Sequence, residues 1–184
     1  IQSVKSGTKA FDWNVPDEWF IKDAFVTDKS GRKIIDYKVN NLHLVGYSEP
    51  IDKWVDFEEL NKHLYSIPSQ PNAIPYVTSY YHKSWGFCIT QNQRDSLSPG
   101  SYHVVIKSSI KPGVLNFGDI YIPSTNKSSK EILISTYICH PSMANNELSG
   151  PLVAVALINF FKKKKLKRSL RFVFVPETIG SIAY

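Results

Sequence analysis

The sequence of 184 residues has few of the features that mark membrane-bound or secreted proteins. No apolar run approaches the roughly 20 residues that a membrane-spanning helix needs. No signal peptide is recognisable either. Because the chain starts at Ile1 rather than at a methionine, the sequence leaves the true N-terminus open. Only two cysteines are present, Cys88 and Cys139, whereas a secreted scaffold held by disulfides usually carries more. We therefore expect free thiols in a reducing, cytoplasmic compartment and no membrane partner.

The composition also excludes a disordered chain, because 42% of the residues are hydrophobic and 13% are aromatic. The net charge is +6, and much of the excess lies in residues 162–168, KKKKLKR. Such a run is typical of a nucleic-acid or membrane patch, or of a helix end whose cations face the negative end of the helix dipole. No aromatic residue interleaves it and an apolar strand follows it, so we favour the helix end and expect no nucleic-acid partner.

Residues 12–112 have the pattern of a small β-rich domain. Alternating runs on either side of residues 29–31 predict a hairpin. A strand is expected over 40–47, and Asp56 followed by Glu59 predicts the capped start of a short helix. A strand over 86–90 and a helical turn over 90–97 follow. The last alternating runs, which flank Pro112-Gly113, predict a second hairpin.

From about residue 130 the pattern changes to that of an α/β domain. Residues 131–138 form a near-continuous apolar run, as in a strand that is covered on both faces of a parallel sheet. Residues 149–165 predict a helix, with Ser149 as its cap and Pro151 in its first turn. An apolar stripe of 152, 155, 156 and 159 or 160 would face the sheet. Residues 169–176 predict a second buried strand, which completes a βαβ unit with parallel strands.

Polar side chains follow both strands of this unit. Because the carboxyl ends of parallel strands share one edge of the sheet, these side chains should converge there. After 131–138 come Cys139, His140, Asn145, Asn146 and Glu147, and after 169–176 come Glu177 and Thr178. Imidazole and carboxylate suit Zn²⁺ or a similar ion, although this spacing is no established metal signature. A nucleophilic Cys139–His140 pair is disfavoured, because neighbours in an extended strand point to opposite faces.

Three segments carry a resemblance to a known family: "ILISTYICHP", "ANNELSGP" and "FVFVPETIGSIAY". They resemble the bacterial aminopeptidase-like metallohydrolases, the group of zinc aminopeptidases and glutamate carboxypeptidases. "SGTKAFDWNVPDEWFIKDAFV" and "IPYVTSYYHKSWGFC" are similar to a branch from polysaccharide-biosynthesis loci, which carries an inserted β-rich domain. The resemblance covers nearly the whole chain.

The resemblance implies a role for each matching position. His140 matches a metal-ligating histidine, and Glu177 matches the catalytic glutamate that acts as general base on metal-bound water. Asn146 stands where the family has an aspartate that bridges two metals, and Thr178 stands where a second ligating glutamate is usual. Since neither supplies a charge, we expect one zinc ion rather than two, with Glu147 as replacement ligand. Asn145, Asn146 and Thr178 would position the ion or the substrate.

The resemblance further implies that the chain is an interior fragment, because the family draws an aspartate and a histidine ligand from later sequence. With about two ligands here, and three or four needed by zinc, we expect a weak or empty metal site in this chain alone. The expected domains are a lead-in of the peptidase-like core at 1–11, the inserted β-rich domain at 12–112, and the first part of the aminopeptidase-like α/β domain at 113–184.

The leading hypothesis is a metal-dependent hydrolase of amide bonds, acting on a small peptide or an acylated amino compound and linked to surface polysaccharide biosynthesis. The alternative is a catalytically inactive binding or scaffold module that retains the hydrolase fold. Asn146 and Thr178 favour the alternative, whereas His140 and Glu177 favour the enzyme. The sequence leaves a homo-oligomer open.

Overall fold

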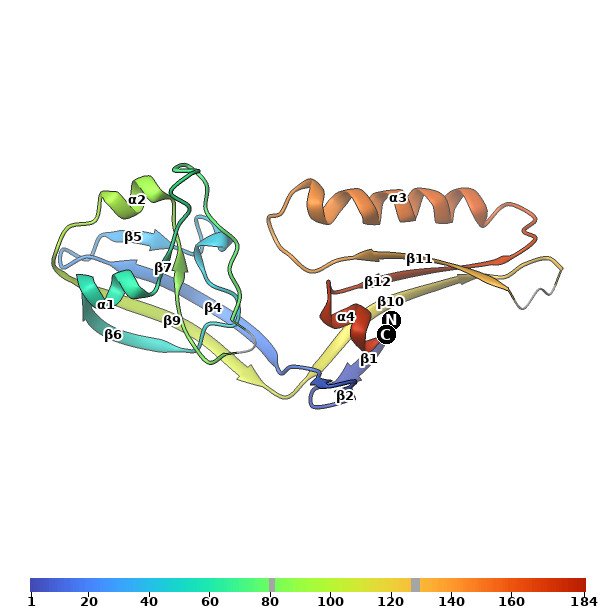
Figure 1. The fold of residues 1–184 in the computed structure, drawn as a ribbon, viewed down its shortest axis with the longest axis horizontal. Coiled ribbons are helices and arrows are strands. Elements are labelled where there is room, and N and C mark those ends of the chain that lie inside the picture. Colours follow the sequence, from blue (N-terminus) through green and yellow to red (C-terminus); the bar gives the residue numbers. More distant parts are fainter. Residues whose placement is uncertain (80–81, 127–129) are drawn as a thin grey trace. The chain divides into compact units, whose positions relative to one another are not determined.

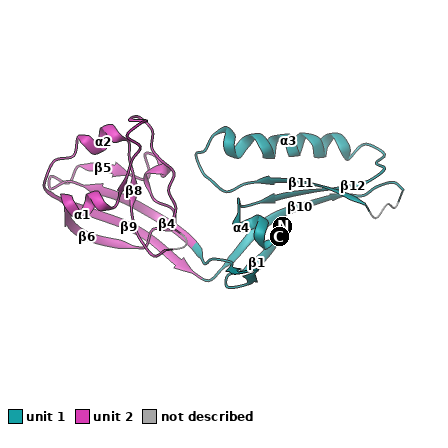
Figure 2. Cartoon of the chain, viewed as in Figure 1, with its two compact units in different colours: residues 1–18, 112–184 teal, residues 19–111 magenta. Residues whose placement is uncertain are grey.

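The computed structural model describes residues 1–79, 82–126 and 130–184, which fold as two compact units (Figure 1, Figure 2). Unit 1 comprises residues 1–18 and 112–184, and unit 2 comprises residues 19–111. Unit 2 is therefore inserted into the chain of unit 1. Residues 12–18, which we had expected in the inserted domain, belong to unit 1.

Unit 2 is built on a four-stranded sheet with the order β5-β4-β9-β6. The strands are β4 (Glu18–Thr27), β5 (Lys33–Asp36), β6 (Ile51–Asp56) and β9 (Ser101–Lys111). β4 and β5 pair antiparallel, which confirms the first predicted hairpin. The core beneath the sheet consists of fully buried apolar side chains, including those of Val26, Leu60, Phe87, Ile89 and Val104.

Short elements complete unit 2: η1 (Asn41–His43), α1 (Phe57–Lys62), β7 (Leu64–Tyr65), β8 (Phe87–Cys88) and α2 (Gln91–Asp95). The predicted cap of α1 is confirmed, since the Asp56 side chain accepts a hydrogen bond from Glu59 N at 2.8 Å. The strand predicted over 40–47 is wrong, because this segment opens with the 3₁₀ turn η1. Asn40 caps that turn by accepting from Leu42 N, a local bond that competes with strand pairing.

The second predicted hairpin is also wrong. β9 ends at Lys111 and β10 (Val114–Ile122) begins after Pro112-Gly113, but the two strands belong to different sheets. β9 pairs with β6 in unit 2, whereas β10 pairs with β1 (Gln2–Lys5) and β12 (Ser169–Val175) in unit 1. The Pro-Gly signal predicted the break in the chain correctly, but the partners of each strand lie far away in the sequence.

The sheet of unit 1 has the order β1-β10-β12-β11. β11 (Glu131–Tyr137) runs parallel to β12 in continuous register from Glu131 opposite Ser169 to Tyr137 opposite Val175. With α3 (Asn145–Phe161) between them, these strands form the predicted βαβ unit, which is confirmed. The remaining elements are the pair β2 (Lys9–Ala10) and β3 (Trp13–Asn14) and the final helix α4 (Ile179–Ala183).

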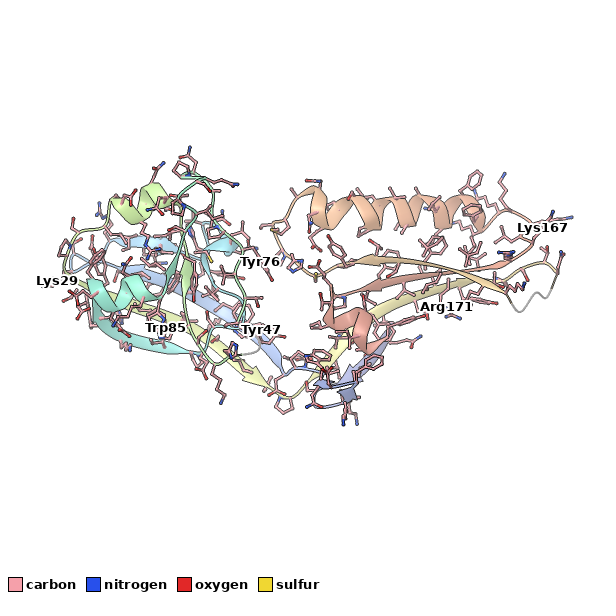
Figure 3. The ribbon with its side chains drawn as sticks, in the orientation of Figure 1. Lys29, Tyr47, Tyr76, Trp85, Lys167 and Arg171 are labelled. Atoms are coloured by element: carbon pink, nitrogen blue, oxygen red, sulfur yellow. The ribbon has the colours of Figure 1, made fainter. Side chains whose placement is uncertain are left out.

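Arg171, labelled in Figure 3, ties three strands of this sheet together. From β12, its guanidinium contacts Asp119 of β10 at 2.8 Å and Glu131 of β11 at 2.7 Å. The hydrogen bonds from Arg171 to Glu131 and Asp119 raise the pKa of the guanidinium further above its ordinary value. The bridging cation thus holds β11 in place beside β12.

α3 begins earlier than predicted. Its N-cap is Ala144, which makes no capping hydrogen bond through its side chain, so Ser149 is not the cap. Pro151 lies inside the helix rather than in its first turn. The early start has a functional consequence, because it places Glu147 in the first helical turn.

The apolar stripe predicted for α3 is wrong. The face that packs on the sheet centres on Ala154, which is 3% exposed, with Leu157, Ile158 and Phe161 against Leu170 and Phe172 of β12. Leu152, Val155 and Phe160 of the predicted stripe are exposed instead. Apolar residues surround the whole helix, so periodicity alone does not distinguish the two faces.

β11 is likewise not covered on both faces in this chain. It is the edge strand of the sheet, and the exposed fractions of Ile132 and Leu133 are 43% and 55%. β12, its inner neighbour, is largely buried, as predicted. Both β11 and β12 therefore have apolar sequences, but only β12 lies in the interior of the sheet in this chain.

Candidate active site

The parallel pairing of β11 and β12 brings His140 and Glu177 to the same edge of the sheet. The register continues past the strands, since Ile138 N donates to Val175 O at 2.9 Å. Two residues further along each segment stand His140 and Glu177. Nε2 of His140 lies 3.6 Å from Oε2 of Glu177. The convergence expected from the sequence thus follows directly from the strand pairing.

Glu147 reaches the same edge from the first turn of α3. One carboxylate oxygen lies 2.8 Å from His140 Nδ1, and the other accepts a hydrogen bond from Cys139 N at 2.8 Å. Burial opposes ionisation of Glu147, but the hydrogen bonds from Cys139 and His140 outweigh it, so its pKa lies below the ordinary value. The helix N-terminus also favours a negative charge there. Glu147 is therefore a carboxylate that fixes the orientation of the imidazole.

Cys139 takes part in the cluster, which the strand argument did not predict. Its Sγ lies 2.9 Å from His140 Nδ1, and Glu177 N points at the same sulfur at 3.3 Å. The alternation of side chains between opposite faces does not apply, because β11 ends at Tyr137 and Cys139 is already in the following loop. Burial raises the pKa of the thiol to about 11, and the charges of Glu147 and Glu177 act in the same direction. Cys139 is thus a neutral thiol rather than an activated nucleophile.

The cluster has the chemistry of a metal centre. One ligand atom from each of Cys139, His140 and Glu147 lies within 4.8 Å of the others. Sulfur, imidazole nitrogen and carboxylate oxygen are the donors that zinc takes in proteins. His140 and Glu147 were expected as ligands, whereas Cys139 was considered only as a nucleophile. The signal that could have identified it is its position directly before a ligand histidine at the end of a strand.

Glu177 is held in a tight turn that presents it to solvent. Its carboxylate side chain is 51% exposed, and Ile179 N donates to Glu177 O at 2.6 Å across Thr178. Thr178 has φ 57° and ψ −71°, the conformation of a strained γ-turn that is rare for a β-branched residue. Strained residues of this kind concentrate at functional sites. The turn lets Glu177 contact His140 while its carboxylate remains accessible to a ligand.

The remaining predicted positions lie around this cluster. Asn145 and Asn146 are exposed in the first turn of α3, directly before Glu147, and Thr178 is exposed after Glu177. Each is therefore solvent-accessible and adjoins Glu147 or Glu177 in the chain or within one helical turn. The roles assigned to them from the resemblance stay predictions.

A family model for a domain of unknown function, DUF2172, matches residues 18–109, half of the chain. The chain belongs to the DUF2172 family. The matched range coincides closely with unit 2, residues 19–111, so the DUF2172 domain is the inserted β-rich unit.

The DUF2172 chain is 50% identical over all its 184 residues to a Clostridium acetobutylicum protein named for polysaccharide biosynthesis and an aminopeptidase-like domain. It spans 42% of that protein's length. A crystal structure from the same organism, named as a peptidase, has 50% sequence identity and a TM-score of 0.93, covering 98% of this chain and 42% of that one. The resemblance to aminopeptidase-like proteins is thereby confirmed.

A zinc aminopeptidase from Bacillus subtilis matches with a TM-score of 0.56 and 11% identity, over 96% of this chain and 51% of that one. At this identity the likeness concerns the fold alone. The predicted fold class, a partial aminopeptidase-like α/β sheet with a β-rich insertion, is confirmed. Within the described residues, no helix is both long and apolar enough to cross a membrane.

Proposed function

We propose that the intact protein containing this DUF2172 chain is a metal-dependent hydrolase of amide bonds. The observation that carries the proposal is the cluster at one sheet edge, in which His140 contacts both Glu147 at 2.8 Å and Glu177 at 3.6 Å. The peptidase and aminopeptidase-like names of the relatives support the same reaction class.

His140, Glu147 and Cys139 would hold a zinc ion, which supplies Lewis-acid polarisation of the scissile carbonyl and acidifies a water molecule. The side chains of His140 and Glu147 are 16% and 11% exposed, so their positions are fixed by the surrounding structure. Cys139 would have to lose its proton on binding, because its pKa of about 11 keeps the thiol neutral. The donor set therefore fits zinc and binds it better as the pH rises.

Glu177 would act as the general base. Its carboxylate is half exposed and faces the imidazole edge, so it can take a proton from a water molecule and return it to the leaving amine. Asn146 and Thr178, which are exposed next to Glu147 and Glu177 in the chain, would hold the substrate by hydrogen bonds. The substrate would be a small peptide with a free amino terminus or an acylated amino compound, and the relative's name supports a link to polysaccharide biosynthesis.

The experiment uses the intact protein, with zinc measured by mass spectrometry and amidase activity measured on amino-acid p-nitroanilides. Glu177→Gln should retain the wild-type zinc content and lose about 10²–10⁴-fold in kcat, as expected for a general base. His140→Ala should lose both zinc and activity. His103→Ala, an imidazole substitution in unit 2, is the matched control and should change neither.

The second candidate is a catalytically inactive module that uses the same edge to bind a sugar or a partner. Asn146 and Thr178 favour it, because neither supplies the charge of the family's aspartate and glutamate. This alternative predicts no zinc at any stoichiometry and no amidase activity in the wild-type protein. That result would overturn the hydrolase proposal.

A further inference from the structure

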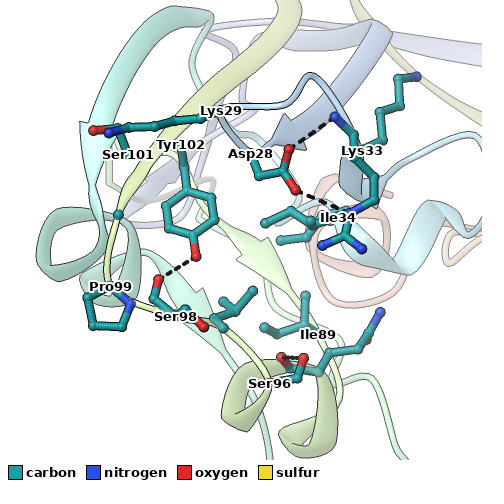
Figure 4. A pocket seen from close by; sticks show the side chains of 15 residues that line it. Asp28, Lys29, Lys33, Ile34, Ile89, Ser96, Ser98, Pro99, Ser101 and Tyr102 are labelled. Atoms are coloured by element: carbon teal, nitrogen blue, oxygen red, sulfur yellow. Dashed lines mark hydrogen bonds and ion pairs between the residues drawn. The ribbon is translucent and has the colours of Figure 1, made fainter.

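Unit 2 contains a cavity of about 480 Å³ that has no part in the candidate active site (Figure 4). We call it the hairpin cavity, because the β4–β5 turn forms one wall. The other walls come from the end of α2 and the loop that leads into β9. Its volume lies in the range of small-molecule binding sites.

The turn that borders the hairpin cavity is basic and internally ordered. Lys29, Arg32 and Lys33 line the cavity, with Asp28 as the acidic residue among its lining side chains. The Asp28 carboxylate accepts hydrogen bonds from Ser30 N at 2.9 Å, Ser30 Oγ at 2.6 Å and Arg32 Nε at 3.1 Å. These bonds hold the pKa of Asp28 below its ordinary value, and the bond from Ser30 Oγ has the largest effect. The Asp28 carboxylate is thus engaged by the turn, and Lys33 pairs with Asp36 at 2.7 Å. Of the three lining cations, Lys29 is the one with no ion pair among the described residues, and it gives the cavity wall its positive charge.

The rest of the lining combines an apolar floor with hydroxyl groups. Ile89 and Ile35 are 0% and 2% exposed, and Ile34 and Leu97 also contribute apolar surface. Tyr102 crosses the cavity and donates its hydroxyl to Ser98 O at 2.6 Å, which fixes the loop (Figure 4). Ser98 and Ser101 also line the cavity, and their side chains carry hydroxyl groups.

We propose that the hairpin cavity binds a small phosphomonoester whose body is a ring of sugar size. Lysine, arginine and serine hydroxyls are the donors that phosphate groups take in proteins. A phosphate ion alone would fill a small part of the cavity. The isoleucine floor offers an apolar surface to the C–H face of a ring, while Ser98 and Ser101 offer hydrogen bonds to its oxygens. This binding is independent of the proposed hydrolase activity, because the lining residues all belong to unit 2.

The test titrates the ¹⁵N-labelled full chain with glucose 1-phosphate and follows amide chemical shifts, with inorganic phosphate and glucose as separate probes at equal ionic strength. We expect saturable shifts confined to residues 28–35, 89 and 93–102. Lys29→Glu should weaken glucose 1-phosphate binding about tenfold, and Lys29→Arg should retain it. Lys107→Glu, which removes an exposed lysine of β9 outside the cavity, should change the affinity less than twofold.

Three results would overturn the proposal. Inorganic phosphate binding as tightly as glucose 1-phosphate would show that the ring is not recognised. Glucose binding as tightly would show that the anion is not recognised. Lys29→Glu and Lys107→Glu weakening glucose 1-phosphate binding equally, with both variants giving folded spectra, would show that the anion is attracted by the net positive charge of the protein and not by the cavity.

Discussion

At the residue scale, the candidate site depends on one carboxylate that serves two neighbours. Glu147 accepts from the backbone of Cys139 and from the ring of His140, although neither bond could be inferred without knowing where α3 begins. Cys139 and Glu177 in turn contact the same imidazole, that of His140. The chemistry of the cluster is therefore sensitive to any change in the charge of Glu147.

Glu147→Gln should lower the free energy of unfolding by about 1–3 kcal/mol at pH 7, because it weakens charged hydrogen bonds in a part-buried site. The pKa of Glu147 is lower in the folded than in the unfolded state. Its stabilising contribution is therefore fully present above the unfolded pKa and is lost as the pH falls through the folded pKa. The difference between wild type and Glu147→Gln should shrink accordingly below about pH 4.5.

Urea unfolding between pH 3 and pH 7 measures this difference. Glu58→Gln, at an exposed residue in the first turn of α1, is the control and should cost a few tenths of a kcal/mol. A Glu147→Gln effect that is equally small, or independent of pH, would contradict the hydrogen bonding described for Glu147.

At the element scale, α3 and β11 approach each other closely at Gly150, three residues after Glu147. Gly150 faces Thr136 of β11 so closely that a methyl group added at Gly150 would overlap Thr136 Oγ1. In an open helix, alanine is more favourable than glycine by about 1 kcal/mol. Here the overlap reverses that preference, since the side chain of Thr136 is β-branched and has little room to move.

Gly150→Ala should therefore destabilise the chain by about 1–3 kcal/mol, the range typical of overpacking. In the Thr136→Ala background the obstructing hydroxyl is gone, and Gly150→Ala should become neutral or stabilising. A double-mutant cycle of unfolding free energies measures the coupling. Equal effects of Gly150→Ala in both backgrounds would show that the helix does not approach the strand at this point.

At the scale of the whole molecule, unit 1 exposes an unusually apolar surface. We call the outward-facing residues Leu148, Leu152, Val153 and Phe160 the outer face of α3, and each is between 56% and 64% exposed. β11 adds an unpaired strand edge with exposed Ile132 and Leu133. Exposed apolar patches and free strand edges both promote association.

The chain should therefore self-associate as its concentration rises. The double substitution Leu152→Lys and Val153→Lys should weaken this association at least fivefold, measured by sedimentation velocity, because it places two charges on the outer face of α3. Val39→Lys alters an exposed residue of unit 2, outside the outer face of α3, and it should leave the association unchanged. A wild type that stays monomeric up to about 1 mM would contradict the prediction, since exposed apolar patches promote association.

The sequence by itself determined the features that rest on neighbouring residues. The hairpin at residues 29–31, the Asp56 cap and the parallel βαβ unit follow from turn chemistry, capping and apolar runs, and the last of these brings His140 and Glu177 together. Only the tertiary structure decided that β9 and β10 separate into two sheets, that Ala154 faces the sheet, and that Cys139 Sγ lies beside His140. The physical reason is that pairing partners, buried faces and loop paths depend on contacts between residues far apart in the chain, which no local pattern encodes.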